Sequence, residues 1–377
     1  MIQCPRSIGR RGFYLSAITV VTLWILGPSS SSPARAEPAF AVRTGYSCGQ
    51  CHVNRTGGGM RTAFGSLYTQ TILPARYLPW GEGKSLIPAN PDARLAYGGD
   101  ARIAYLGVKS EDYDDTSSFE IPAANVYGQL RIVPERLVFY LDQGVGAGVS
   151  SSRELFGLLS FRPGNGYLKV GKFIPPFGWA LPDDDAFIRE PIGFAFSAPD
   201  IGIEAGFEPG KWSVHLAVIN GNAATRDDDR TKKFTLLTVR RFNRSKIGLS
   251  AANDLSGGTA TTWAGLLGGL HFGRFSLLAE GDWRRARPDD VASTETSVGM
   301  FEANLLLKRG MNLKYAHDWI DPNRDVKTDA RQRDSLGFEY IPYPFVQLRA
   351  FVRVKDGPPQ VPGSRDEQLD LEVHLFF

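Results

Sequence analysis

The chain has 377 residues, of which 42% are hydrophobic, and its mean hydropathy of −0.19 excludes a bundle of membrane-spanning helices. Glycine is frequent, with 41 residues, and aromatic residues make up 11%, a mixture that favours many short strands. The net charge of +3 comes from four arginines, unaccompanied by any acid, in residues 1–36. Without those four the chain has 39 basic and 40 acidic residues, which argues against nucleic-acid binding.

Residues 1–36 have the three parts of a secretory signal peptide. Basic residues up to Arg11 come first, an apolar stretch from about Phe13 to Leu26 follows, and Ala34-Arg35-Ala36 supplies a cleavage pattern. The apolar stretch is short for a membrane anchor. We therefore predict that the chain is exported and that the mature protein begins after Ala36.

The chain has three cysteines, and only Cys48 and Cys51 remain once the signal peptide is removed. His52 follows directly, so the motif is C-x-x-C-H, which is typical of covalent c-type haem attachment. In that chemistry the two thiols bind the haem vinyl groups and the histidine binds the iron. A structural zinc site needs further ligands nearby, and the remaining alternative is a redox C-x-x-C beside a chance histidine. We predict one covalent haem c on Cys48, Cys51 and His52.

Residues 37–91 form the predicted haem-binding segment, which is about 55 residues long. A domain of that size is marginal even with a stabilising cofactor. The apolar spacing predicts a single helix, over residues 59–71. One helix cannot enclose a haem, so we expect the rest of the chain to cover it.

The sixth ligand of the iron has several candidates. Met60 is the only methionine of the segment and follows three glycines that permit a sharp return of the chain. A thioether ligand raises the haem potential relative to a second imidazole. The alternatives are a five-coordinate iron, simple packing of Met60, or one of four histidines farther along the chain, which are His215, His271, His317 and His374.

Residues 92–377 repeat one pattern, in which a short alternating run is followed by a turn. The last run is the clearest, because apolar side chains take every second position and the other positions are all polar. A period of two with one polar face is the signature of a β-strand. Sixteen such strands are predicted, starting near residues 94, 118, 135, 153, 166, 199, 211, 231, 246, 260, 274, 295, 310, 334, 344 and 367.

The connections between these strands alternate in length. Seven are tight turns, such as residues 163–166 and 243–245, and eight are longer loops, such as residues 320–333. This alternation is typical of a 16-stranded antiparallel outer-membrane β-barrel, with its turns in the periplasm and its loops outside. A soluble two-sheet sandwich is the alternative, but it does not require the alternation. We predict an all-β barrel whose lumen is plugged by the haem segment.

The long loops are rich in carboxylates, which attract cations. The connection over residues 173–198 is the longest and carries many aromatic residues, which we expect to be buried by an inward fold that narrows the lumen. Its first part, Gly171–Gly178, resembles a segment of phosphate-type porins. The acidic clusters lie at residues 111–115, 183–185, 227–229 and 289–290.

The stretches Pro38–Ala41, Thr44–His52 and Ala63–Gly65 resemble the haem segment of the monohaem porin–cytochrome fusions of the iron(II)-oxidase type. The resemblance implies electron transfer across the outer membrane, from extracellular Fe(II) to a periplasmic cytochrome, and a possible iron(II) oxidase activity. The chain departs from the family at Asn54–Met60, where the iron oxidases typically carry a His-Phe-Pro stretch. Outward electron transfer to external acceptors therefore remains an alternative, as does a solute porin whose haem segment acts as a plug or redox sensor.

Overall fold

The computed structural model describes residues 37–78, 93–146, 152–181, 183, 185–223, 227, 230–255, 258–289 and 291–377. The predicted signal peptide and the last part of the predicted haem segment, residues 79–91, lie outside the described residues. No helix within the described ranges has the length and apolar character needed to cross a membrane.

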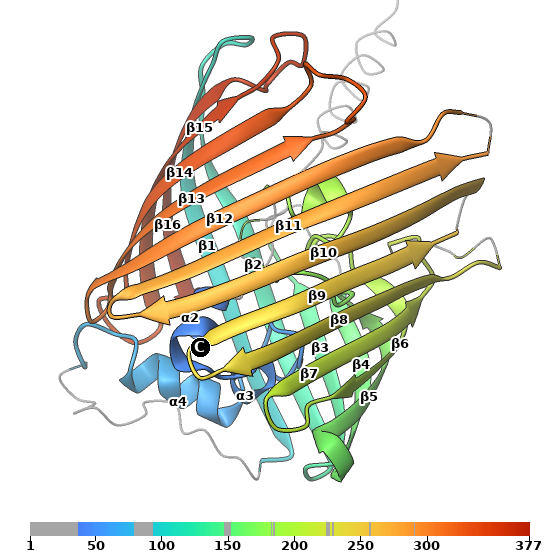
Figure 1. Ribbon diagram of the computed structural model, residues 1–377. Coiled ribbons are helices and arrows are strands. Elements are labelled where there is room, and N and C mark those ends of the chain that lie inside the picture. The colour runs from blue at the N-terminus through green and yellow to red at the C-terminus, as the bar shows by residue number, and fades with distance from the viewer. Residues whose placement is uncertain are drawn as a thin grey trace, which may run out of the picture. The chain divides into compact units, whose positions relative to one another are not determined.

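Sixteen antiparallel strands close into a barrel, in which each strand pairs with its sequence neighbours and β1 pairs with β16 (Figure 1). Each strand begins within three residues of its predicted start, so the 16-strand prediction is confirmed. The strands are β1 Leu95–Ser110, β2 Thr116–Val133, β3 Leu137–Gly144, β4 Ser152–Phe161, β5 Gly166–Phe173, β6 Asp200–Phe207, β7 Trp212–Ile219, β8 Lys233–Phe242, β9 Ser245–Asp254, β10 Thr259–Phe272, β11 Phe275–Pro288, β12 Thr294–Lys308, β13 Met311–Asp321, β14 Arg331–Tyr340, β15 Val346–Asp356 and β16 Asp366–Phe376.

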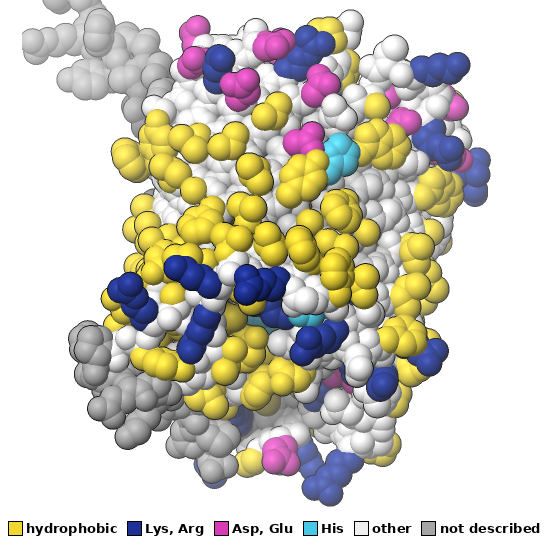
Figure 2. Space-filling view, turned by 60° about the vertical axis from the view of Figure 1, so that its left-hand side comes forward, with side chains coloured by type: hydrophobic (Ala, Val, Ile, Leu, Met, Phe, Trp, Pro, Cys, Tyr) yellow, Lys and Arg dark blue, Asp and Glu magenta, His cyan; other side chains and the backbone are white. Residues whose placement is uncertain are grey.

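Closure depends on the register of the first and last strands, in which Arg102 lies opposite His374. The alternation of β16 then sends Glu372 and His374 into the lumen, where both are buried, and leaves Leu371 and Val373 exposed on the outer face. The same division holds around the barrel and forms a band of hydrophobic side chains (Figure 2). A polar lumen and an apolar exterior suit a barrel surrounded by lipid.

The tight turns form because their residues tolerate a positive φ. In the turn between β8 and β9, Asn243 has a φ of 52°, and in the turn between β10 and β11, Gly273 has a φ of 55°. All seven short connections lie at one end of the barrel, which we call the short-turn end, and the long loops lie at the other.

Among the described residues, three helices lie at the short-turn end: α2 (Pro38–Thr44), α3 (Cys48–Cys51) and α4 (Ala63–Thr71) (Figure 1). The predicted start of the helix at residue 59 is wrong. Residues Gly57, Gly58 and Gly59 have φ angles of 105°, 83° and 63°, which a right-handed helix does not allow. The helix begins instead after Thr62, whose side chain accepts a hydrogen bond from the backbone N–H of Gly65. The helices α2 and α3 are too short to give a periodic signal.

The connection between β5 and β6 folds into the lumen, as its aromatic residues predict. It includes a 3₁₀ turn, η2 (Glu190–Ile192), and a second such turn, η1 (Pro163–Asn165), connects β4 and β5. Its Phe177, Trp179 and Phe194 are buried in one apolar cluster with Val42 of α2 and Trp263 of β10. The N-terminal segment, the inward loop and the barrel wall therefore share a core.

Candidate functional site

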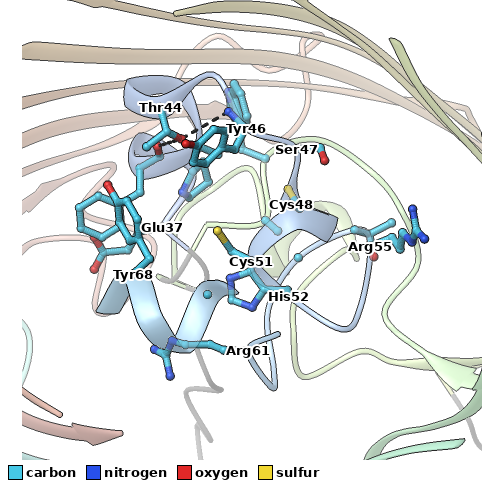
Figure 3. Close-up of a pocket in the computed structure, with 18 of the residues that line it drawn as sticks. Glu37, Thr44, Tyr46, Ser47, Cys48, Cys51, His52, Arg55, Arg61 and Tyr68 are labelled. Atoms are coloured by element: carbon cyan, nitrogen blue, oxygen red, sulfur yellow. Dashed lines mark hydrogen bonds between the residues drawn. The ribbon is translucent and has the colours of Figure 1, made fainter. Parts of the chain in front are cut away.

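The two cysteines lie on α3, a helix of a single turn. The backbone N–H of Ser47 donates to Oε1 of Gln50 at 2.9 Å, which closes the start of this turn. A separation of three residues places the side chains of Cys48 and Cys51 on neighbouring parts of the helix surface. Both are free thiols, and Figure 3 shows them on the same side of the motif as the ring of His52.

A cavity of about 170 Å³ adjoins this motif and is lined by both thiols and by His52. Its volume is about ten times what a single water molecule requires, which is roughly 10–15 Å³. Residues of α2 and α4 form one part of its lining, including Phe40 and Tyr68. The inward loop contributes Trp179, and the barrel wall supplies the rest. The barrel therefore covers the motif, as the short segment requires.

His52 follows α3, and its backbone N–H donates to the carbonyl oxygen of Cys48 at 2.9 Å. Burial, reinforced by the nearby positive charge of Arg61, lowers the pKa of His52 to about 4. The imidazole is therefore neutral at neutral pH, which is the state that binds a metal. Its Nδ1 is buried and has no hydrogen-bond partner among the described residues.

The thiols are not in the state expected of a redox dithiol. Burial raises the pKa of Cys48, although Lys246 acts in the opposite direction. Burial also raises the pKa of Cys51, and the neighbouring Cys48 raises it further. Reactive C-x-x-C pairs depend on a lowered pKa, so the site favours a structural or covalently modified role. Two adjacent thiols and a neutral imidazole beside a cavity fit a covalently bound haem.

The helix α4 rests directly on the motif because Gly65 has no side chain. An ideal Cβ on Gly65 lies 2.2 Å from the carbonyl oxygen of Cys51. An isolated antiparallel bridge between His52 and Arg61 closes the intervening loop. Gly65 belongs to the stretch Ala63–Gly65 that resembles the family's haem segment, but nothing in the sequence indicates its contact with Cys51 or the bridge of Arg61, since a close backbone approach leaves no periodic signal.

Met60 is not brought together with the cysteines. It is buried against Tyr127, Tyr140 and Phe156, its backbone N–H donates to the hydroxyl of Tyr140 at 2.9 Å, and it does not line the cavity. Its ligation of the iron stays a prediction. Of the four barrel histidines, His215 and His374 line the cavity, whereas His271 and His317 do not. The described residues contain no group of three His, Cys, Asp or Glu side chains suited to a metal ion.

A buried polar network joins the segment to the wall of the barrel. The amide of Asn54 donates to Oε1 of Glu154 at 2.7 Å and accepts from Nζ of Lys169 at 2.9 Å. Lys169 also pairs with Glu204 at 2.8 Å, and both of these side chains are fully buried. Nearby, Arg55 pairs with Glu208 at 2.9 Å. Charged residues at inward positions of β4–β6 are the signal by which the sequence could have revealed this network.

The inward loop is hydrogen-bonded to the opposite wall. The backbone N–H of Gly178 donates to the hydroxyl of Ser250 at 2.9 Å, and that of Trp179 donates to Oε2 of Glu280 at 2.6 Å. Asp183 pairs with Arg333 at 2.9 Å. Because this arginine compensates the charge of Asp183, the acidic cluster attracts external cations less than its sequence suggests. Asp184 lies outside the described residues.

No family model and no curated protein matches the chain. Solved structures do. An anion-selective porin from Comamonas acidovorans is similar with a TM-score of 0.60 and 12% identity, covering 75% of this chain and 99% of that one. OmpT of Vibrio cholerae is similar with a TM-score of 0.59 and 10% identity, and the match covers 75% of this chain and 97% of that one. OprB of Pseudomonas putida is similar with a TM-score of 0.56 and 10% identity, and the match covers 75% of this chain and 94% of that one. At these identities the likeness shows a porin-like barrel fold.

Proposed function

We propose that the protein transfers electrons across the outer membrane through one covalent haem c held inside its barrel. The observation that carries the proposal is the position of the C-x-x-C-H motif, whose two thiols and imidazole line a cavity enclosed by the barrel wall and the inward loop. A haem held there would place a redox centre within the barrel of a membrane whose hydrocarbon core electrons cannot otherwise cross.

Each residue of the motif has a distinct role in this proposal. Cys48 and Cys51 would hold the haem through thioethers, and an imidazole nitrogen of His52 would bind its iron. A bound haem supplies a reversible one-electron couple between ferrous and ferric iron. The network around Lys169 fixes the chain that follows His52, because Lys169 donates to the side chain of Asn54.

A location in the outer membrane is supported by the apolar exterior of the barrel and by its similarity to porins. Leu249, Leu266 and Leu336 are more than half exposed on three different strands. Such side chains are stable only against lipid or another apolar surface. The short turns then face the periplasm, and the haem segment lies at the periplasmic end.

We propose extracellular Fe(II) as the electron donor and a periplasmic cytochrome as the acceptor. The resemblance to the iron(II)-oxidase type of porin–cytochrome supports this direction. Exposed acidic residues of the long loops, such as Asp114 and Asp289, support an encounter with cations.

A solute porin with a haem plug is the second candidate, and the porin-like fold favours it. The two candidates differ in what crosses the lumen. Electron transfer requires the cavity to hold a haem and leaves solute flux low, whereas a working porin passes sugars and ions.

The test uses the full chain expressed with the haem-attachment machinery and purified in detergent. We expect haem staining that survives denaturing electrophoresis, and a Soret band that shifts when Fe(II) is added anaerobically. Replacing both cysteines with alanine should abolish the staining. A parent protein without covalent haem refutes the proposal. If Fe(II) does not reduce the haem but a reduced periplasmic cytochrome does, the direction of electron transfer is outward.

A further inference from the structure

The outward face of α4 is apolar and exposed. Phe64 and Leu67 of α4 are 43% and 44% exposed, and Ile72, which directly follows the helix, is 54% exposed. Gly65 and Thr69, on the other side of the helix, face Cys51 and the cavity. The apolar face therefore lies one helix thickness, about 10 Å, from the cysteine motif.

The short turns around this helix are basic. Within the seven short turns, all of which the structure describes, Glu135 is the only exposed acid. Six of these turns carry an exposed basic residue, namely Arg136, Arg162, Lys211, Arg244, Arg274 and Arg309. Basic side chains also gather below the hydrophobic band in Figure 2.

The chain itself connects the apolar face to these turns. The carbonyl oxygen of Thr71 accepts a hydrogen bond from Arg309 at 2.6 Å, and the backbone N–H of Ala75 donates to Ile341 at 2.8 Å. Arg76 follows and is exposed. The apolar face is thus fixed to the turns between β12 and β13 and between β14 and β15.

We propose that the apolar face of α4, with the basic turns around it, is the docking site of a soluble redox protein whose own contact face is acidic. Small apolar contacts within a charged rim suit transient complexes, because the charges speed association and the small area permits rapid release. Because the side chains around the apolar face are positively charged, they favour a partner with an acidic contact face. That this partner is a redox protein rests on the proposed function.

Anionic lipid headgroups are the other chemistry that a basic surface attracts. Lipid reaches the outer wall of the barrel, where Arg240 lies over the rings of Trp212 and Phe242 at 5.2 and 4.7 Å. The face of α4 lies instead at the mouth of the barrel, below the strand ends (Figure 1). This position favours a soluble protein.

The experiment measures binding to the full chain in nanodiscs. The probes are a small basic cytochrome c and the same cytochrome succinylated at its lysines, which makes it acidic. We expect the succinylated form to bind and the native form not to bind, with an affinity that falls as salt rises. The triple variant R76E/R244E/R274E should weaken binding about tenfold at low ionic strength. The matched control R230E/R287E/K327E reverses three exposed charges at the long-loop end of the barrel and should bind like the parent.

The double variant L67Q/I72Q should also weaken binding but leave its salt dependence unchanged. Equal binding of both cytochromes, or no difference between the two triple variants, overturns the proposal. Binding that follows the phosphatidylglycerol content of the nanodisc, and not the charge of the cytochrome, assigns the basic turns to lipid. The measurement does not need haem, so a haem-free chain that binds the acidic probe contradicts the proposed function while the docking surface stands.

Discussion

His52 and Arg61 face each other across an isolated antiparallel bridge, and the guanidinium of Arg61 lies 4.4 Å from the centre of the Phe376 ring. This pairing closes the glycine loop that follows the cysteine motif. It also joins the motif to the last strand of the barrel, which is more than 300 residues away in the chain. The histidine is thus connected, through Arg61, to a strand that lies far from it in the sequence.

Replacing Met60 tests whether this buried residue binds the haem iron or only packs against the barrel wall. Leucine has a similar volume, so Met60→Leu should cost less than about 1.5 kcal/mol of stability. An unchanged haem spectrum in this variant would assign Met60 to packing alone. His52→Ala should retain the haem through its thioethers but shift the Soret band. Loss of the near-infrared charge-transfer band in Met60→Leu, with the fold intact, would instead identify the thioether as the sixth ligand.

The contact between α4 and α3 predicts a strong effect of a single methyl group. Gly65→Ala places a Cβ against the carbonyl oxygen of Cys51, so the helix must move away from the motif. We expect less covalent haem per barrel, measured by the ratio of Soret to protein absorbance. Gly281→Ala is the control, because its Cβ meets only one atom, at 3.9 Å. Equal haem content in the two variants would contradict the close packing.

Removing the Lys169 ammonium should loosen the segment from the wall. Lys169→Met leaves Glu204 as a buried carboxylate without its partner, which costs about 3–5 kcal/mol. The temperature at which the folded band disappears from unheated detergent gels should fall accordingly. Lys109→Met serves as the control, since its pair with Glu367 is exposed and contributes less than about 1 kcal/mol. A fall of equal size in both variants would show that the buried network does not stabilise the attachment of the segment to the wall.

The inward loop predicts a barrel that conducts poorly. Replacing residues 177–196 with a short glycine linker removes the contacts of Trp179 with Glu280 and Ala279. We expect single-channel conductance in planar bilayers to rise well above that of the parent. Shortening a different long loop, by deleting residues 324–328 between β13 and β14, should not raise it. High conductance of the parent itself would favour the solute porin.

The strand count and the strand starts were predictable from the sequence, and the C-x-x-C-H motif is visible in it. A strand's period of two and a turn's need for positive φ are local properties, so residues such as Asn243 and the alternation of β16 display them directly. The C-x-x-C-H motif is local for the same reason. The inward fold of the loop that contains Trp179 was also predictable, because its aromatic residues needed a place away from water.

Other features depend on contacts between distant residues, and only the tertiary structure decided them. Asn54 and Lys169 are 115 positions apart, and neither has a neighbour in the sequence that indicates the other. The same holds for the histidines, since the closure of the barrel determines that His215 and His374 line the cavity whereas His271 and His317 do not. The sequence determined which side chains point inward, because inward and outward positions alternate along a strand. Which inward side chains meet depends on the register of all sixteen strands around the ring.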